Sequence, residues 1–293
     1  MYKFVVVSAI LAGQALVGQA LAQGYPAKPI RYVVPFPPGA FNDTLGRTIA
    51  QKFTEGGFAQ TVVDNRPGAG STIGTDIVAK APADGYTVLG VAVPFAVNAS
   101  LYARLPFDTV RDFTGVIYAG ATPNMLVMHP SVPVSSIKEL IALAKAKPNQ
   151  LNYASTGNGT SNHMSMELFK LMTNTQIVHI PYKGSAPALT DLMGGHVMMI
   201  FDNTPNVLPH AKTGKMKAIA ITSLKRSELA PEVPTVDESG VKCFEVNVTR
   251  PTATSPARST TAPASDGTRS APVAGTPPNR PGSWSRPAML FRC

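Results

Sequence analysis

The chain has 293 residues, of which 44% are hydrophobic and 15% charged, so it can bury cores for two domains of ordinary size. The formal net charge is +9, but residues 249–293 carry a net of +5 and Lys3 adds one more. The remainder has a modest net charge of +3 and no basic run with interleaved aromatic residues, which argues against nucleic acid as a partner.

Residues 1–22 are predicted to be a signal peptide. Lys3 precedes an apolar stretch, and Ala20-Leu21-Ala22 fits the A-x-A cleavage pattern, with Gln23 as the first mature residue. A buried N-terminal helix or a membrane anchor is the alternative, but the glycines and glutamines inside the stretch weaken it. No later segment has enough consecutive apolar residues to cross a bilayer, so an exported, soluble protein is expected.

Strands and helices alternate from residue 29 to residue 247, which predicts an α/β fold with parallel sheets covered by helices on both faces. Residues 23–122 are interpreted as a first lobe. Apolar β-branched runs, helical spacing and Gly or Pro punctuation predict its elements. The predicted strands are 30–35, 61–63 and 86–91, and the predicted helices are 44–53 and 73–81.

Residues 123–234 are interpreted as a second lobe of similar make-up. The predicted strands are 125–128, 151–154, 177–180, 197–201 and 216–222. The predicted helices are 135–146, with Ser135 or Ser136 as N-cap, 162–172 and 187–193. A last short strand within 243–247 is assigned back to the first lobe. Two α/β lobes predict a cleft between them, with ligand bound beyond the carboxyl ends of the strands.

The pattern stops at residue 248. Residues 248–293 consist mainly of Pro, Ser, Thr, Ala, Gly and Arg and cannot bury enough apolar surface to offset their ordering entropy, so a disordered tail is predicted. The tail is either a natural Pro-rich extension or the product of a frameshift. No disulfide is predicted between Cys243 and Cys293, and two cysteines are too few for a metal cluster.

Two glycine-bearing turns, 35–44 and 155–161, each follow a predicted strand and open a predicted helix. The amides of a helix N-terminus and the close approach that glycine permits make an anion site without Lys or Arg. The alternative is that each turn is only a tight strand-to-helix connection. Asp43 either caps its helix or accepts from a ligand amine, and Asp202 follows a strand that ends at the expected cleft.

A hydrolase is the alternative from another functional class. Ser155, Ser161, His163 and Asp202 supply the side chains of a triad, but no G-x-S-x-G elbow follows a strand. Ser161 and His163 lie two apart on a predicted helix and therefore do not face each other. The histidines also lack metal-ligand spacing, so neither an enzyme nor a metal site is predicted.

An ordered set of motifs from about residue 25 to residue 247 resembles the Bug-type extracytoplasmic solute-binding receptors of tripartite tricarboxylate transporters. The motifs are residues 25–31, 35–43, 65–70 with 73–74, 84–87, 155–161, 181–188, 201–203 and 231–235. The resemblance implies a two-lobed, type II periplasmic binding fold that closes on a small carboxylate. It further implies a monomer in the periplasm that needs no cofactor or metal and hands its ligand to membrane permease subunits.

The resemblance also implies a set of ligand-binding residues, which lie in matching loops of the two lobes. They are Gly39, Ala40, Phe41 and Asp43 in the first lobe, and Ser155, Thr156, Asn158, Gly159, Thr160, Tyr182 and Asp202 in the second.

Two departures from the family pattern carry expectations of their own. Ala40 stands where the family usually has glycine, so backbone strain is expected there. The family's C-terminal helices are replaced by the Pro-rich tail, so apolar surface on the first lobe is expected to be uncovered and stability lowered. A truncated receptor without function is therefore a third interpretation.

Overall fold

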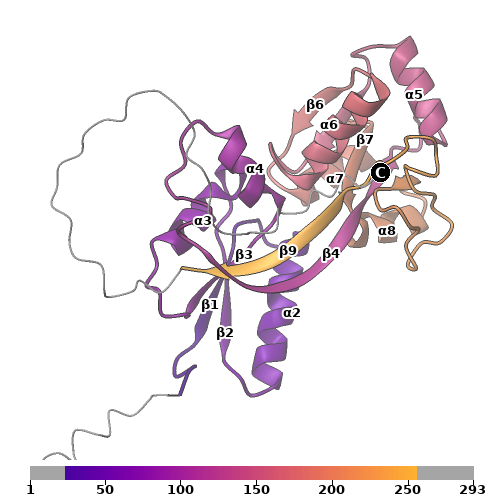
Figure 1. Cartoon of the computed structure of the whole chain (residues 1–293). Helices are drawn as coiled ribbons and strands as arrows, with labels where there is room; N and C mark the ends of the chain where they lie inside the picture. The colour runs from indigo at the N-terminus through magenta and orange to yellow at the C-terminus, as the bar shows by residue number, and fades with distance from the viewer. Residues whose placement is uncertain (1–23, 256–293) are drawn as a thin grey trace, which may run out of the picture.

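The computed structural model describes residues 24–255, which form two α/β lobes joined by a pair of long strands (Figure 1). This two-lobed α/β architecture confirms the predicted fold class. Residues 1–22 and 256–293, for which a signal peptide and most of a disordered tail are predicted, lie outside the described residues. Within 24–255 no helix is both long and apolar enough to span a membrane.

The first lobe is built on three parallel strands with β1 in the middle. Ile30 of β1 pairs with Thr61 of β2, and Arg31 pairs with Thr87 of β3. A buried cluster that includes Val33, Leu89 and Val78 packs under the sheet. The elements are β1 (Ile30–Val34), α2 (Phe41–Glu55), β2 (Thr61–Asn65), the short 3₁₀ helix η1 (Ala69–Ser71), α3 (Thr72–Ala79), β3 (Thr87–Gly90) and α4 (Val93–Leu101).

The second lobe repeats the strand-to-helix alternation. Parallel β5 lies between β6 and β7, and the rings of Phe169, Phe201 and Phe244 are buried together in its core. The elements are α5 (Ile137–Ala146), β5 (Asn152–Ser155), α6 (Ser161–Thr173), β6 (Val178–Pro181), α7 (Ser185–Met193), β7 (Met199–Asn203), α8 (Thr204–Lys212) and β8 (Lys217–Ile221).

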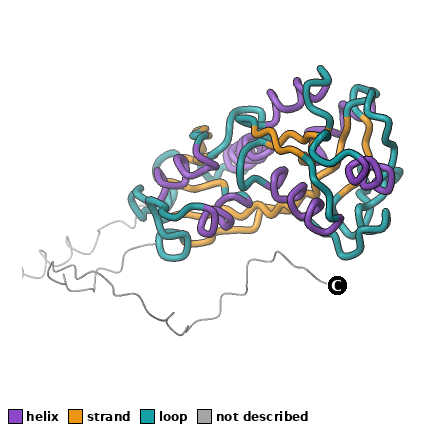
Figure 2. The backbone as a smooth tube through the Cα atoms, turned by 90° about the horizontal axis from the view of Figure 1, so that it is seen from above, coloured by secondary structure: helices purple, strands orange, loops and turns teal. Residues whose placement is uncertain are grey.

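Two antiparallel strands cross from one lobe to the other. Strand β4 (Thr114–Met128) pairs with β9 (Asn247–Thr254) along its first part and with β7 and β8 along its second part. Strand β9 also pairs with β3. The strands thus form one connected sheet in the order β2-β1-β3-β9-β4-β7-β5-β6, with β8 beside β4. Figure 2 shows this sheet running through both lobes with helices around it.

The crossing strands correct several predictions. The lobe boundary at 122/123 falls inside β4, and residues 248–254, assigned to the tail, are part of β9. Residues 244–246 are not a strand, although Phe244 is fully buried. The prediction of no disulfide is wrong for Cys243, which is disulfide-bonded. Backbone pairing with β4 and β3 holds the Thr- and Pro-containing β9 in the sheet, and composition alone does not reveal such partners.

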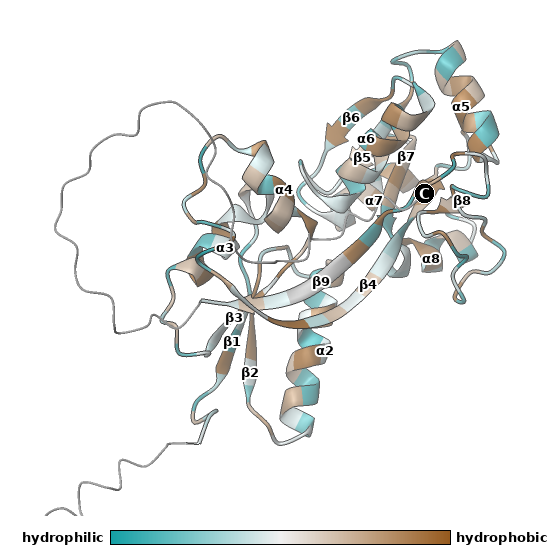
Figure 3. Ribbon diagram, in the orientation of Figure 1, coloured by the Kyte–Doolittle hydropathy of each residue, from teal (hydrophilic) through white to brown (hydrophobic). Residues whose placement is uncertain are grey.

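The first-lobe end of β4 includes hydrophobic residues (Figure 3) that are exposed to solvent. Val116, Ile117 and Tyr118 are 59–63% exposed. These three residues form an exposed apolar stretch, and its connection with the C-terminal helices of the family stays a prediction. The chain follows β9 out of the sheet beside this stretch, because Thr254 pairs with Thr114.

Candidate functional site

A cleft between the lobes contains about 390 Å³ of space, part of it open to solvent. The first lobe contributes residues 36–37, 40–42 and 92–94, and the second contributes 156, 160–162, 184–185 and 203. Every one of these segments lies at or just before the start of a helix, so the cleft is built mainly from strand-to-helix turns.

Five helices begin at the cleft, α2 and α4 from the first lobe and α6, α7 and α8 from the second. Within the described chain, none of their N-cap side chains makes a capping hydrogen bond. Helix α5, which does not border the cleft, is capped by Ser136, whose hydroxyl accepts from the Glu139 amide. The cleft therefore collects first-turn amides and the positive ends of helix dipoles.

No lysine or arginine is found among the described residues that line the cleft. The local field is thus set by oriented N–H groups and by uncharged side chains. Such an arrangement attracts anions and imposes direction on their oxygens, because each amide points along a fixed line.

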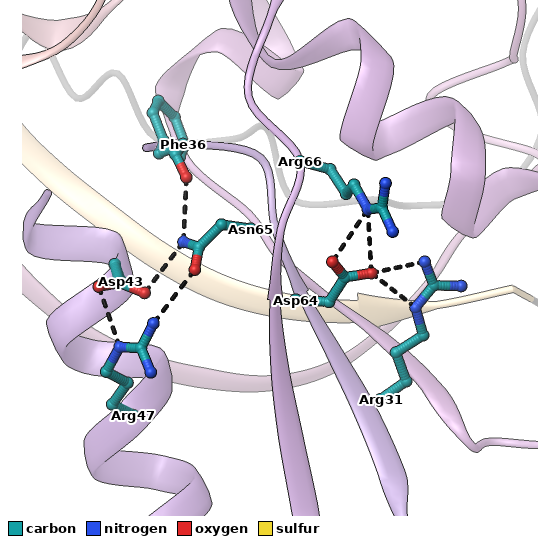
Figure 4. A network of polar contacts seen from close by, with 7 residues as sticks. All are labelled: Arg31, Phe36, Asp43, Arg47, Asp64, Asn65 and Arg66. Atoms are coloured by element: carbon teal, nitrogen blue, oxygen red, sulfur yellow. Dashed lines mark hydrogen bonds and ion pairs between the residues drawn. The ribbon is translucent and has the colours of Figure 1, made fainter. Parts of the chain in front are cut away.

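The first glycine turn is shaped by Asp43, which is 4% exposed. Its Oδ2 accepts from Arg47 Nε at 3.0 Å and its Oδ1 accepts from Asn65 Nδ2 at 2.9 Å (Figure 4). Oδ2 also accepts from the Gly39 amide at 2.9 Å. Burial opposes ionisation, but these bonds outweigh it and lower the pKa of Asp43. Both carboxylate oxygens are therefore occupied by hydrogen bonds within the first lobe, and Asp43 does not line the cleft.

The strain expected at Ala40 is absent from this turn. Ala40 has φ −69° and ψ 154°, an ordinary extended conformation, and the positive φ of 78° falls on Gly39 instead. Alanine therefore fits the N-cap position of α2 without a conformational penalty. Ala40 and Phe41 both line the cleft.

The second glycine turn, called here the 155–160 loop, is held by side chains of its own lobe. Ser155 is fully buried and its Oγ lies 2.6 Å from His179 Nε2. Thr160 Oγ1 donates to the Gly157 carbonyl at 2.7 Å. Thr156 and Thr160 line the cleft, whereas Ser155 does not. Asn158 and Gly159 lie on the side of this loop that faces α4 and η1 of the first lobe.

Asp202 is fully buried beside the cleft rather than on its wall. Its Oδ1 accepts from Asn162 Nδ2 at 2.9 Å and from the Asn203 amide at 2.7 Å. Its Oδ2 has no hydrogen-bond partner among the described residues, although the Ser185 hydroxyl is close enough to favour the charged form. Burial outweighs these contacts and raises the pKa of Asp202.

Tyr182 is also engaged within the second lobe. Its hydroxyl donates to Asp191 Oδ2 at 2.7 Å, and burial together with this bond raises the pKa of Tyr182 to about 12. Tyr182 does not line the cleft.

The side chains considered for a hydrolase do not form a triad. Ser155 contacts His179 rather than His163, and Asp202 contacts Asn162 and Asn203 rather than a histidine. Ser155 is also closed off from the cleft by burial. No group of three His, Cys, Asp or Glu residues within the described residues has the arrangement of a metal site.

Sequence reasoning missed several residues that line the cleft. The main ones are Val93, Pro94, Asn162 and Asn203. The sequence does contain a helix-start signal at two of these turns. A proline lies in the first turn of α4 and of α8, where proline is common in helices. Asn162 carries no such signal, since its role follows from its contact with the distant Asp202.

The lobes touch each other at glycines on either side of the cleft. A Cβ on Gly184 would lie 3.2 Å from Pro37 Cγ, and a Cβ on Gly159 would lie 3.1 Å from Leu101 Cδ2. Both contacts join the second lobe to the first, so the described conformation is closed at these points.

Comparison with known proteins places the cleft in a family context. The model of the "Tripartite tricarboxylate transporter family receptor" family matches residues 45–262, which extends the family-like sequence past residue 247. Protein BugT of Bordetella pertussis is 40% identical over 241 residues, covering 82% of this chain and 74% of that protein. Another curated relative at 40% identity is covered over only 66% of its length.

Two solved structures with ligands resemble the whole two-lobed body. An R. palustris protein with adipate has a TM-score of 0.76 and 37% identity, covering 79% of this chain and 78% of that one. MatC from Rhodopseudomonas palustris with bound malate has a TM-score of 0.74 and 27% identity, covering 79% of each chain. The ligands of both structures are dicarboxylates.

Proposed function

The chain belongs to the tripartite tricarboxylate transporter receptor family, and from this premise we propose that it is a periplasmic receptor that captures a small dicarboxylate between its lobes. The observation that carries the proposal is the convergence of five helix N-termini on a cleft without lysine or arginine. The ligand would be held as an anion by amides, then handed to membrane permease subunits by a monomeric receptor.

A dicarboxylate suits this cleft because first-turn amides come from both lobes. One carboxylate would contact the turn at Ala40 and Phe41, and the other the turns at Thr156 and Thr160. The adipate and malate of the similar structures have this two-ended form. The remaining predicted residues would shape or close these turns from behind: Gly39, Asp43, Ser155, Asn158, Gly159, Tyr182 and Asp202.

Binding would consist of capture and closure without a chemical step. A ligand bridging the lobes adds favourable contacts only in the closed state, so it shifts the population toward closure. The lobes already fit together at the Gly184–Pro37 and Gly159–Leu101 contacts, where a Cβ on either glycine would be tightly packed. Closure would exclude water and strengthen the amide–carboxylate bonds.

The first prediction concerns carboxylate binding itself. Adipate or malate is expected to raise the melting temperature of the chain from Gln23, because binding to the native state stabilises it by mass action. Asn42→Asp, which places a carboxylate in the first turn of α2 at the cleft, is expected to weaken binding at least about tenfold by like-charge repulsion. Isothermal titration calorimetry and thermal melts measure both effects.

The matched control is Gln60→Glu, which adds the same charge to the exposed surface of the first lobe. It should leave affinity within about twofold, since exposed charges far from the site are screened by salt. A folded chain that binds none of a panel of mono-, di- and tricarboxylates would contradict the proposal. The absence of any cooperative melt would instead support the interpretation as a truncated receptor without function.

A further inference from the structure

Beneath the 155–160 loop lies a cluster of aromatic and charged side chains that the proposed function does not use. His163 on α6 stacks on His179 of β6, with ring centroids 4.3 Å apart, and His179 stacks in turn on Tyr153 of β5 at 4.8 Å. Glu167 and Lys170, also on α6, border the same cluster. His179 contacts Ser155 at the start of the loop, and His163 contacts Gly159 near its end.

The contact of His163 with the loop fixes its tautomer. The Gly159 amide donates to His163 Nδ1 at 3.2 Å, so Nδ1 must carry a lone pair and the ring proton must sit on Nε2. Nε2 lies 4.0 Å from Glu167 Oε1, an acceptor that suits this tautomer. A second proton on the ring would have to go onto Nδ1, where it would face the Gly159 N–H and break the bond.

The contact between His179 and Ser155 responds differently to protonation of the ring. Its Nε2 lies 2.6 Å from Ser155 Oγ, and a hydroxyl can either donate or accept. If His179 gained a proton, Ser155 could accept from it and turn its own hydrogen toward the Gly157 carbonyl, 3.3 Å away. The Ser155–His179 contact therefore tolerates a protonated His179, whereas protonation of His163 removes the bond from the Gly159 amide.

We propose that His163 is a positioning residue that ties the 155–160 loop to α6 through Nδ1, and that protonation of its ring in acidic medium releases the loop and weakens ligand binding. The second half of this inference rests on the proposed receptor function. The first half does not, because it concerns only the loop and its anchor.

The surrounding charges decide which ring takes the proton first. Burial lowers the pKa of His163, with Lys170 acting in the same direction and Glu167 opposing it. Burial lowers the pKa of His179 further, to about 4, and the neighbouring His163 adds to the shift. Tyr153, bonded to Glu167, presents an uncharged ring to the stack. As the pH falls, His163 is thus protonated before His179, below the usual range of a histidine.

The test uses NMR of the folded chain together with two variants of the anchor. In the parent chain, the Gly159 amide signal should titrate with the same midpoint as the His163 ring, and the ring nitrogens should show the Nε2–H tautomer above it. His163→Asn keeps an acceptor close to the Nδ1 position but cannot be protonated, so its Gly159 amide should stay bonded at every pH. His163→Leu should expose this amide to faster exchange throughout. A ring that titrates without moving the Gly159 signal would overturn the inference.

The link to ligand is measured with adipate and malate. Because the carboxyls of these probes titrate in the same range, the quantity compared is the Kd of the parent divided by that of His163→Asn at each pH. This ratio should rise severalfold as the pH falls from 7.5 through the midpoint of the His163 titration, and His163→Leu should bind weakly throughout. His196→Asn, a change of an exposed histidine, is the control and should follow the parent. A constant ratio would overturn the link. The NMR result stands without any ligand, so failure of the receptor function remains a separate outcome.

Discussion

Two buried aspartates beside the cleft have pKa values shifted in opposite directions. Asp43 is surrounded by donors on both oxygens, which lower its pKa despite burial. Asp202 has donors on Oδ1 only, and burial dominates and raises its pKa. The difference does not come from the number of donors, because Asp202 accepts from at least as many as Asp43. Asp43 has the cationic Arg47 beside it, whereas Asp202 is more deeply buried and has no cationic partner among the described residues.

The raised pKa of Asp202 predicts a pH-dependent effect of Asp202→Asn on stability. Between the pKa of an unfolded aspartate and the higher folded value, the native state binds more protons, so the parent chain loses stability as the pH rises through this window. The amide variant has no such loss. The melting temperature of Asp202→Asn minus that of the parent should therefore increase from pH 4 to pH 7.

Calorimetry at several pH values measures this difference, with the exposed Glu232→Gln as the control that should show no comparable trend. A difference that stayed flat or fell with rising pH would mean that Asp202 is ionised and stabilised in the native state.

At the scale of elements, the five helices that begin at the cleft have no side-chain cap, whereas α5, away from the cleft, has one. Ser136 caps α5, and Glu139 Oε2 accepts from the Ser135 amide in return, as expected where a helix needs only to be stable. Ala40 stands at the N-cap of α2, where an alanine offers no acceptor. Helix α3, which does not border the cleft, has no side-chain cap either, so the missing cap is shared by all five cleft helices but is not confined to them.

A pair of substitutions compares the uncapped α2 at the cleft with the capped α5 away from it. Ala40→Ser should add about 0.5–1 kcal/mol to the free energy of unfolding, because the extended backbone of Ala40 suits a capping hydroxyl. It should also weaken adipate or malate binding several-fold, because the hydroxyl occupies an amide that the carboxylate would use. Ser136→Ala should cost about 1 kcal/mol and leave binding unchanged. Urea denaturation and calorimetry measure the two quantities; tighter binding by Ala40→Ser would contradict the role given to α2.

The elements that sequence patterns predicted are those with local signals. Helix α5 has a serine N-cap and apolar residues at helical spacing. The turns before α2 and α6 each combine glycine with the start of a helix. Helix α4 was missed because its run is almost entirely apolar and shows no amphipathic period, only a proline near its start. Strand β9 was cut short because its stabilising partners, β3 and β4, lie far away in the sequence.

The site residues also differ in whether local sequence or the three-dimensional fold reveals them. The glycine turns, with Ala40 and Thr160, could be predicted because each turn is formed by consecutive residues of the chain. The roles of Asn203 and Asn162 depend on strand β7 ending beside α6, which brings Asp202 to them. His163, which the sequence offers as a side chain for a triad, accepts instead from the Gly159 amide.

At the scale of the whole molecule, function rests on two lobes that are joined by β4 and β9 and touch across the cleft. Leu101, at the end of α4, is the first-lobe side chain nearest to Gly159 of the second lobe, ahead of Asn98 and Val97. It is 49% exposed, so it contributes little to the core of its own lobe. A larger side chain at this position should therefore disturb closure without disturbing either lobe.

Leu101→Trp is expected to weaken adipate or malate binding by about tenfold, because the ring occupies the space that Gly159 needs in the closed state. The melting temperature without ligand should change little. Leu171→Trp, at an 80% exposed position on α6, is the matched control and should alter neither quantity. Small-angle scattering adds a direct readout: ligand should reduce the radius of gyration of the parent and of Leu171→Trp, but not of Leu101→Trp. Equal affinity and equal compaction in all three chains would mean that the Leu101–Gly159 contact is not part of the closing movement, and that ligand is held without the lobes meeting there.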